Sequence, residues 1–180
     1  MGRVAAGNGK KSVGSLVLSL GVCVVAAGVI YLFVPHDDSG GSQVKRVDYK
    51  VELSTARRAA PYPVAAPTGL SHDWKPTSVR YQGTANDGWH LGYLDPEGQY
   101  VAVEQATGRA KGFINKVSQG ASATGRTERI GGETWERYKG EKYDALVLKQ
   151  KGSTTVVTGT ADFAQLRKMA EALEMKREKL

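Results

Sequence analysis

A chain of 180 residues with a formal net charge of +7 and a mean hydropathy of −0.36 fits one folded domain with accessory segments. Arg3, Lys10 and Lys11 supply +3 near the start. The remaining +4 comes from 22 basic and 18 acidic residues that are interspersed and not interleaved with stacking aromatics, which argues against nucleic-acid binding. The only cysteine, Cys23, lies in an apolar run, so the rest of the chain forms neither a disulfide nor a thiolate metal site.

The apolar run, residues 13–34, contains no charged residue. As a helix it would be ~33 Å long, enough to cross a hydrocarbon layer of ~30 Å. Basic residues precede the run, and Asp37 and Asp38 follow it. The positive-inside rule then places a basic tail, 1–12, in the cytoplasm and residues 35–180 outside it. We therefore predict a single transmembrane helix that contacts the lipid bilayer of the plasma membrane.

Other interpretations of this run are less favoured. A cleaved signal peptide has a shorter apolar core and a small-residue cleavage site, and no such site follows Val34. Lipid attachment at Cys23 would require a small residue in place of Val22 and polar residues afterwards. One face of the helix carries small residues that would let a second helix approach, although such residues are also common in membrane helices: Ser15, Ser19, Cys23 and Ala27.

Beyond the apolar run we predict a flexible stalk over residues 35–46 and one extracytoplasmic domain over residues 47–180. Helical spacing predicts a helix over about 47–60, ended by Pro61. Three prolines make the segment 61–67 extended, because proline fixes φ and removes a backbone donor.

Alternating side chains and turn residues predict short strands that pair as hairpins wherever a Pro-Gly or Gly turn separates them. The strongest turn is Asp95-Pro96-Glu97-Gly98. Helical spacing predicts two more helices, at 110–117 and from a capping Thr160 through Leu173. Sequential hairpins and amphipathic helices together predict an α+β fold: a largely antiparallel sheet with the helices on one face. The strands expected are 78–82, 88–94 with 99–105, 126–130 with 133–138, and 143–149 with 154–159.

No pattern in the sequence indicates catalysis. The segment from Gly7 to Ser12 departs from a phosphate-binding loop at two of its defining positions. Ser71-His72-Asp73 are neighbours in the chain, and such neighbours rarely converge in space as a catalytic triad does. We therefore expect a protein that is not an enzyme, with no catalytic residues, no metal and no cofactor. A cleft in which His90 meets a carboxylate would instead favour an enzyme.

The large aromatic residues leave two interpretations open. Tryptophan side chains dominate packing energy, so Trp74, Trp89 and Trp135 are core candidates. Alternatively, some of these residues line a groove or an interaction surface between sheet and helix. The possible groove or interaction residues are Trp74, Arg80, Trp89, Tyr93 and Trp135.

These segments together resemble a family of actinobacterial single-pass membrane proteins, known as domain of unknown function 4245. Beyond the basic start and the apolar run, the resemblance rests on Pro67-Thr68-Gly69-Leu70, Trp74, Ser78-Val79-Arg80-Tyr81, Trp89-His90-Leu91-Gly92-Tyr93, Gln99-Tyr100-Val101-Ala102, Glu104-Gln105, the Gly-x-x-Trp of Gly132 and Trp135, and Val156-Val157-Thr158-Gly159-Thr160. The resemblance implies a location in the envelope of a high-GC Gram-positive bacterium, and no activity. We expect a domain that interacts with an unknown envelope protein or, alternatively, a sensor that binds a small ligand or lipid.

Overall fold

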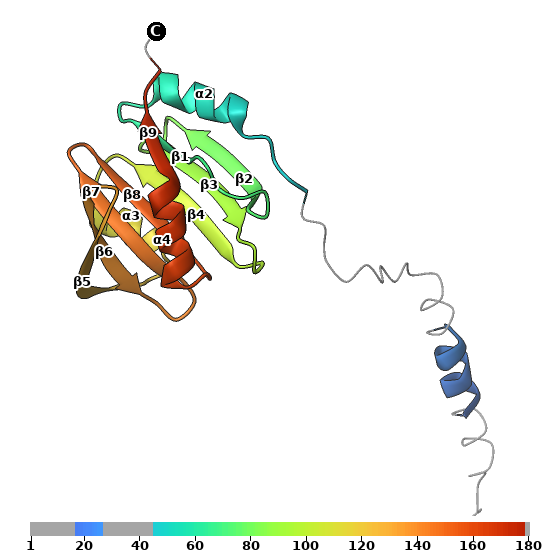
Figure 1. Cartoon of the computed structure of the whole chain (residues 1–180). Helices are drawn as coiled ribbons and strands as arrows, with labels where there is room; N and C mark the ends of the chain where they lie inside the picture. Colours follow the sequence, from blue (N-terminus) through green and yellow to red (C-terminus); the bar gives the residue numbers. More distant parts are fainter. Residues whose placement is uncertain (1–16, 27–44, 179–180) are drawn as a thin grey trace, which may run out of the picture. The chain divides into compact units, whose positions relative to one another are not determined.

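The computed structural model describes residues 17–26 and 45–178, and the chain divides into two units, 1–43 and 44–180. In the first unit, residues 17–26 form a helix (Figure 1). Its side chains are exposed. Among the described residues, no helix combines the length and the apolar character needed to cross a membrane. The predicted span, 13–34, extends beyond these residues on both sides. Of its proposed packing face, Ser15 and Ala27 lie outside the described residues, as do the tail and most of the stalk.

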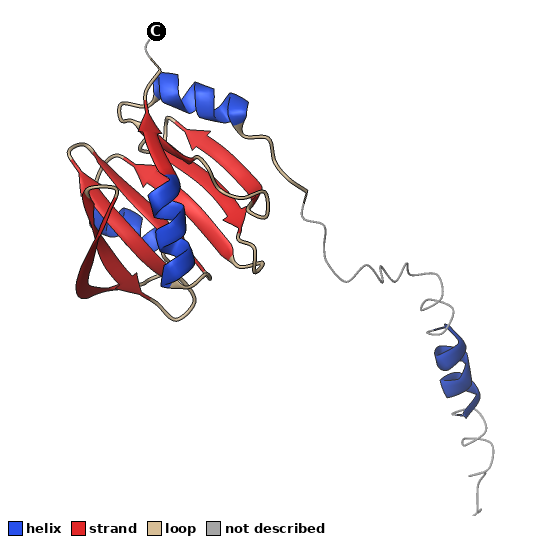
Figure 2. Cartoon of the chain, viewed as in Figure 1, coloured by secondary structure: helices blue, strands red, loops and turns tan. Residues whose placement is uncertain are grey.

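The second unit is built on a seven-stranded antiparallel sheet with the order β2-β3-β4-β8-β7-β6-β5, labelled in Figure 1. Its strands are drawn in red in Figure 2. The central pair, β4 and β8, joins a half made of β2–β4 to a half made of β5–β8. The α+β fold and the antiparallel sheet are therefore confirmed. The strands are β2 (Lys75–Gln82), β3 (Gly88–Leu94), β4 (Tyr100–Ala106), β5 (Ser122–Ile130), β6 (Glu133–Lys139), β7 (Asp144–Gln150) and β8 (Ser153–Gly159).

Two further strands form a separate short ribbon, which is not part of the seven-stranded sheet. It pairs β1 (Val64–Pro67), within the segment predicted to be extended, with β9 (Leu173–Lys176). The prediction that the last helix includes Leu173 is wrong, because α4 (Phe163–Ala172) ends one residue earlier and the chain continues as β9. The other helices of residues 45–178 are α2 (Lys50–Ala59) and α3 (Ala110–Val117).

The hairpin of β3 and β4 forms as predicted around Asp95 to Gly98. The Asp95 carboxylate accepts hydrogen bonds from the backbone N–H groups of Glu97, at 2.9 Å, and Gln99, at 2.8 Å. Gly98 has φ 79°, which favours glycine there. This turn sets a register in which Leu94 pairs with Tyr100, and it thereby fixes every partner along the two strands.

The helices do not share one face of the sheet, so that part of the prediction is wrong. On β7, Leu146 and Leu148 join the larger core beneath α4, whereas Ala145 and Val147 pack with Ile114 of α3. Because successive side chains of a strand point to opposite faces, α3 and α4 cover opposite sides. β7 is buried from Asp144 through Leu148, and β8 is buried throughout, so both strands need cover on each face.

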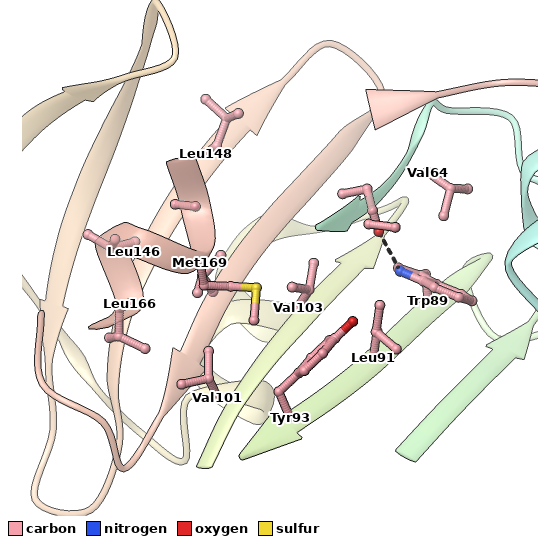
Figure 3. Close-up of a cluster of buried hydrophobic side chains, with 14 of the residues drawn as sticks. Val64, Trp89, Leu91, Tyr93, Val101, Val103, Leu146, Leu148, Leu166 and Met169 are labelled. Carbon is pink, nitrogen blue, oxygen red and sulfur yellow. Dashed lines mark hydrogen bonds between the residues drawn. The ribbon is translucent and has the colours of Figure 1, made fainter. Parts of the chain in front are cut away.

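The larger core holds the ribbon against the α4 side of the sheet. Figure 3 shows Val64, Trp89, Leu91 and Met169 within this core, where the Trp89 indole N–H donates a 2.9 Å hydrogen bond to the Ala65 carbonyl. A buried indole N–H without an acceptor would cost free energy, so the bond helps to fix β1 over β3.

The start of α4 differs in detail from the prediction. Asp162 caps the helix by accepting a 2.9 Å hydrogen bond from the Gln165 backbone N–H. The hydroxyl of Thr160, the predicted cap, instead accepts from the Tyr100 backbone N–H at 2.9 Å. Thr160 therefore links the start of β4 to the end of β8.

Candidate functional site

A groove of about 710 Å³ lies on the α3 face of the sheet. The helix packs over β7 and β8 through Ile114, and the part of that face formed by β2, β3 and β4 borders the groove. Its volume lies in the range of small-molecule sites. The side chains on which its chemistry depends are Arg80, His90, Tyr100, Glu104, Arg109, Phe113, Lys116 and Tyr143.

A hydrogen-bonded row of three side chains crosses adjacent strands beside this groove. The Ser78 Oγ lies 2.8 Å from His90 Nε2, and His90 Nδ1 lies 2.6 Å from Glu104 Oε1. An ionised carboxylate only accepts, so the proton of a neutral imidazole sits on Nδ1, and Nε2 accepts from the Ser78 hydroxyl. The side chains of His90 and Glu104 are each 17% exposed. These two side chains are therefore largely shielded, and both line the groove, whereas Ser78 lies behind them, bound to His90.

Strand register explains why the row forms. His90 of β3 pairs with Glu104 of β4 on one side and with Arg80 of β2 on the other. Ser78 pairs with Gly92, next to a register shift between Pro76 and Ser78 in β2. Directly opposed side chains and their diagonal neighbours lie within contact distance, which brings three residues distant in sequence together.

Gly92 provides the space in which the Ser78 hydroxyl sits. A Cβ at this position would collide with Ser78 Oγ and lie 2.9 Å from the Tyr100 hydroxyl. The two hydroxyls thus meet over the same glycine. Burial is the main cause that raises the pKa of Tyr100 to about 12, and the charge of Glu104 adds to it. Tyr100 is consequently a neutral hydroxyl at pH 7.

Three cationic side chains line the groove: Arg80 from β2, Arg109 just before α3, and Lys116 on α3. None of them forms an ion pair with a carboxylate of residues 17–26 or 45–178. Glu104 is the single acidic residue among the described residues that line the groove, and it is bound to His90. The groove therefore presents an excess of positive charge.

Aromatic residues give the groove an apolar part as well. The rings of Tyr100 and Tyr143 lie 6.0 Å apart at an angle of 37°. Phe113 and Val117 of α3 line the same groove. A ligand that fits both surfaces would combine an anionic group with an aromatic or aliphatic part.

The predicted site residues are divided between the two faces. Arg80 is exposed and lines the groove. The other four, Trp74, Trp89, Tyr93 and Trp135, are buried in the larger core. Trp89 borders the groove, but its indole N–H is bound to Ala65 in that core. The structure therefore does not bring these five residues into one groove.

A smaller hollow of about 390 Å³ is bordered by Trp74, Tyr93 and Arg46. The rings of Trp74 and Tyr93 lie 6.5 Å apart in an edge-on arrangement. The Arg46 guanidinium donates to the carbonyls of His72, at 2.8 Å, and Trp74, at 3.0 Å. Because its cation already binds backbone, this hollow offers less to a ligand than the groove beside α3.

Sequence reasoning missed Ser78, Glu104, Tyr100, Arg109 and Lys116. Part of the signal was present, since alternation places His90 on the face opposite Trp89 and Leu91. In the part of the chain that the structure describes, no group of three His, Cys, Asp or Glu side chains could hold a metal ion.

The chain belongs to the family described as Protein of unknown function (DUF4245), which it matches over residues 9–173. The family expected from the resemblance is therefore correct. No curated protein matches the chain.

Proposed function

We propose that this family member is a membrane-anchored binding domain of a bacterial cell envelope, and that its groove beside α3 binds a small anionic ligand. In this proposal the predicted helix over residues 13–34 is the anchor, and the domain lies outside the cytoplasm. The resemblance found in the sequence supports this proposal, because it implies an envelope protein of a high-GC Gram-positive bacterium. The proposed function concerns the binding of this ligand at the membrane.

The observation that carries the ligand proposal is the set of three cations around one concave surface. Arg80, Arg109 and Lys116 have no carboxylate partner among the described residues, so an incoming anion displaces only water from them. Clefts lined by charge of one sign concentrate ligands of the opposite sign. Arginine also offers a planar set of donors that suits carboxylate and phosphate groups.

The shape of the site favours a small ligand, which the sequence analysis gave as the alternative, over the envelope protein partner that it put first. Protein partners commonly bury about 800 Å² on each side, over a broad surface. A groove of about 710 Å³ with aromatic rings inside it suits a small molecule instead. The expected role is a sensor or carrier of such a ligand at the membrane.

The ligand proposal is tested by purifying the full chain in detergent and identifying co-purifying small molecules by mass spectrometry. A variant with Arg80→Gln, Arg109→Gln and Lys116→Gln should lose an anionic ligand that the parent protein retains. A matched variant with the same loss of charge elsewhere, Arg58→Gln, Arg126→Gln and Lys151→Gln, should keep it. A reproducible protein partner without a small ligand, or an anion that survives the groove variant, would contradict the proposal.

The anchoring proposal is tested separately with a reporter enzyme that is active only outside the cytoplasm. Fused after Leu180, the reporter should be active in cells, and removal of residues 13–34 should release the protein from the membrane fraction. An inactive reporter in an intact fusion would overturn the proposed orientation.

A further inference from the structure

The row formed by Ser78, His90 and Glu104 has the connectivity that activates a serine hydroxyl. A nucleophile lies within hydrogen-bond distance of a base, at 2.8 Å, and the base is oriented by a third group, at 2.6 Å. The two partners also contact the correct nitrogens of the His90 ring, because the Ser78 hydroxyl faces Nε2 and the Glu104 carboxylate faces Nδ1. We infer that Ser78 is a nucleophile that takes an acyl group from a carboxylic ester bound in the groove, with His90 as general base.

Glu104 is a positioning residue in this arrangement. Its carboxylate holds the Nδ1 proton and leaves Nε2 free to accept. Once His90 has taken the serine proton, the same carboxylate stabilises the resulting imidazolium. Both side chains are mostly shielded from water, so this stabilisation is stronger than between two exposed side chains.

The proposed reaction consumes one ester and one water molecule. As Ser78 Oγ forms a bond to the ester carbonyl carbon, its proton moves to His90 Nε2. The bond between that carbon and the alcohol oxygen then breaks, and the alcohol leaves with the proton from Nε2. Water attacks the acylated serine, gives its proton to Nε2, and releases the carboxylic acid as the proton returns to Ser78 Oγ.

Two side chains, Tyr100 and Arg80, are available to stabilise the negative charge that develops on the carbonyl oxygen of the ester. The Tyr100 hydroxyl lies beside Ser78 above Gly92 and remains protonated at pH 7. Arg80, two residues after Ser78 on β2, lines the same groove. Donors already held at such a position lower the barrier because they need no reorganisation during the reaction.

We expect the ester to carry an anionic group, because Arg109 and Lys116 line the groove. This expectation rests on the proposed function. The nucleophile itself rests only on Ser78, His90 and Glu104. The two ideas are therefore tested with different reagents. An uncharged fluorophosphonate reports on the serine alone, because Ser78 Oγ displaces fluoride from phosphorus and the serine proton passes to His90.

The experiment treats the full chain in detergent with this fluorophosphonate and maps the adduct by mass spectrometry. One adduct per chain, on Ser78, is expected. Ser78→Ala should abolish it, and His90→Gln should slow labelling by roughly 100-fold, the size of a typical general-base contribution. Ser71→Ala is the matched control, because Ser71 is an exposed serine beside His72 and Asp73 and should not affect labelling.

Trp fluorescence checks that each variant is folded, and Glu104→Gln replaces His90→Gln if the latter does not fold. No adduct on Ser78, or labelling that is unchanged in the folded His90 or Glu104 variant, overturns the inference. If the adduct is absent while the anionic ligand still binds, only this inference fails. If Ser78 reacts but no anion binds, the inference that Ser78 is a nucleophile is supported and the proposed class of ligand is contradicted.

Discussion

The side-chain carbonyl of Gln105, on β4, accepts a hydrogen bond of 2.7 Å from the backbone N–H of Ala65, on β1. The same amide donates to the Thr155 hydroxyl at 2.9 Å and to the Pro63 carbonyl at 3.3 Å. Gln105 is fully buried, and it therefore ties the ribbon to two strands of the main sheet.

Replacing Gln105 with leucine, a residue of similar size, should lower the stability of the domain. Gln105→Leu leaves the buried N–H of Ala65 without that acceptor, which we expect to lower the free energy of unfolding by about 1–3 kcal/mol. Gln150→Leu, at an exposed position on β7, should change it by less than ~0.5 kcal/mol. Urea denaturation measures both values. Equal stability of the two variants would contradict the role given to Gln105.

Two glycine-to-alanine substitutions should have opposite effects on stability. At Gly92 the new methyl group collides with Ser78 Oγ, and we expect a loss of about 1–3 kcal/mol. At Gly112, within α3, no atom outside the adjoining backbone of the helix lies within 4 Å of the new Cβ, and alanine should stabilise the helix by about 0.4–1 kcal/mol. Thermal unfolding compares the two, and a stable Gly92→Ala protein would show that the crowding is relieved at little cost.

Two lysine ion pairs should differ in their contribution to stability. Asp144, with a side chain 10% exposed, is bound by Lys139 at 2.7 Å, whereas Glu136 and Lys149 are 39% and 45% exposed. Lys139→Met leaves a shielded carboxylate with the weaker 3.3 Å bond from the Gly140 N–H, and should cost about 1–3 kcal/mol. Lys149→Met removes a surface pair and should cost less than ~1 kcal/mol. Chemical denaturation of the two variants under identical salt conditions tests this difference, and the reverse order would contradict it.

Alkaline pH should destabilise the domain through its shielded tyrosines. Burial raises the pKa of Tyr100 to about 12, and it also raises the pKa values of Tyr62 and Tyr93 above the ordinary value of 10.0. Below pH 10 these hydroxyls are protonated in both states. Above it, the unfolded chain loses protons that the folded one keeps, so stability falls as pH rises from about 10 to 12.

The absorbance of tyrosinate, followed during a pH titration, should show a group of tyrosines that ionise late in the folded protein and at their ordinary pH in denaturant. Tyr100→Phe should remove one of the late groups and make the loss of stability above pH 10 less steep. A Tyr100 that ionises near pH 10 in the folded chain would contradict its burial beside Gly92.

The turn residues predicted the β3–β4 hairpin, and this hairpin brings together two residues of the candidate site, His90 and Glu104. The turn that includes Asp95 and Gly98 aligns Leu94 with Tyr100, and counting back from that pair places His90 opposite Glu104. The position of Ser78 could not be obtained in the same way. It depends on the register shift after Pro76, which no local pattern specifies.

The errors elsewhere arise from long-range packing. Hairpins alone suggest a sheet with one covered face, but the apolar residues on both faces of β7 and β8 require helices on both sides. Leu173 continues the apolar spacing of α4, yet it pairs with Pro67 of β1, more than a hundred residues earlier. Such a partner overrides the local helical preference.

The β1–β9 ribbon also determines how the domain responds to mechanical force. Val64, the first residue of β1, pairs with Lys176, the last residue of β9, so the two strands leave the ribbon at the same end. Tension between the ends of the domain would separate these pairs one after another, instead of shearing them all at once. The ribbon therefore opens pair by pair from that end. The seven-stranded sheet lies between β1 and β9 in the chain, so tension along the backbone reaches it only after the two strands part.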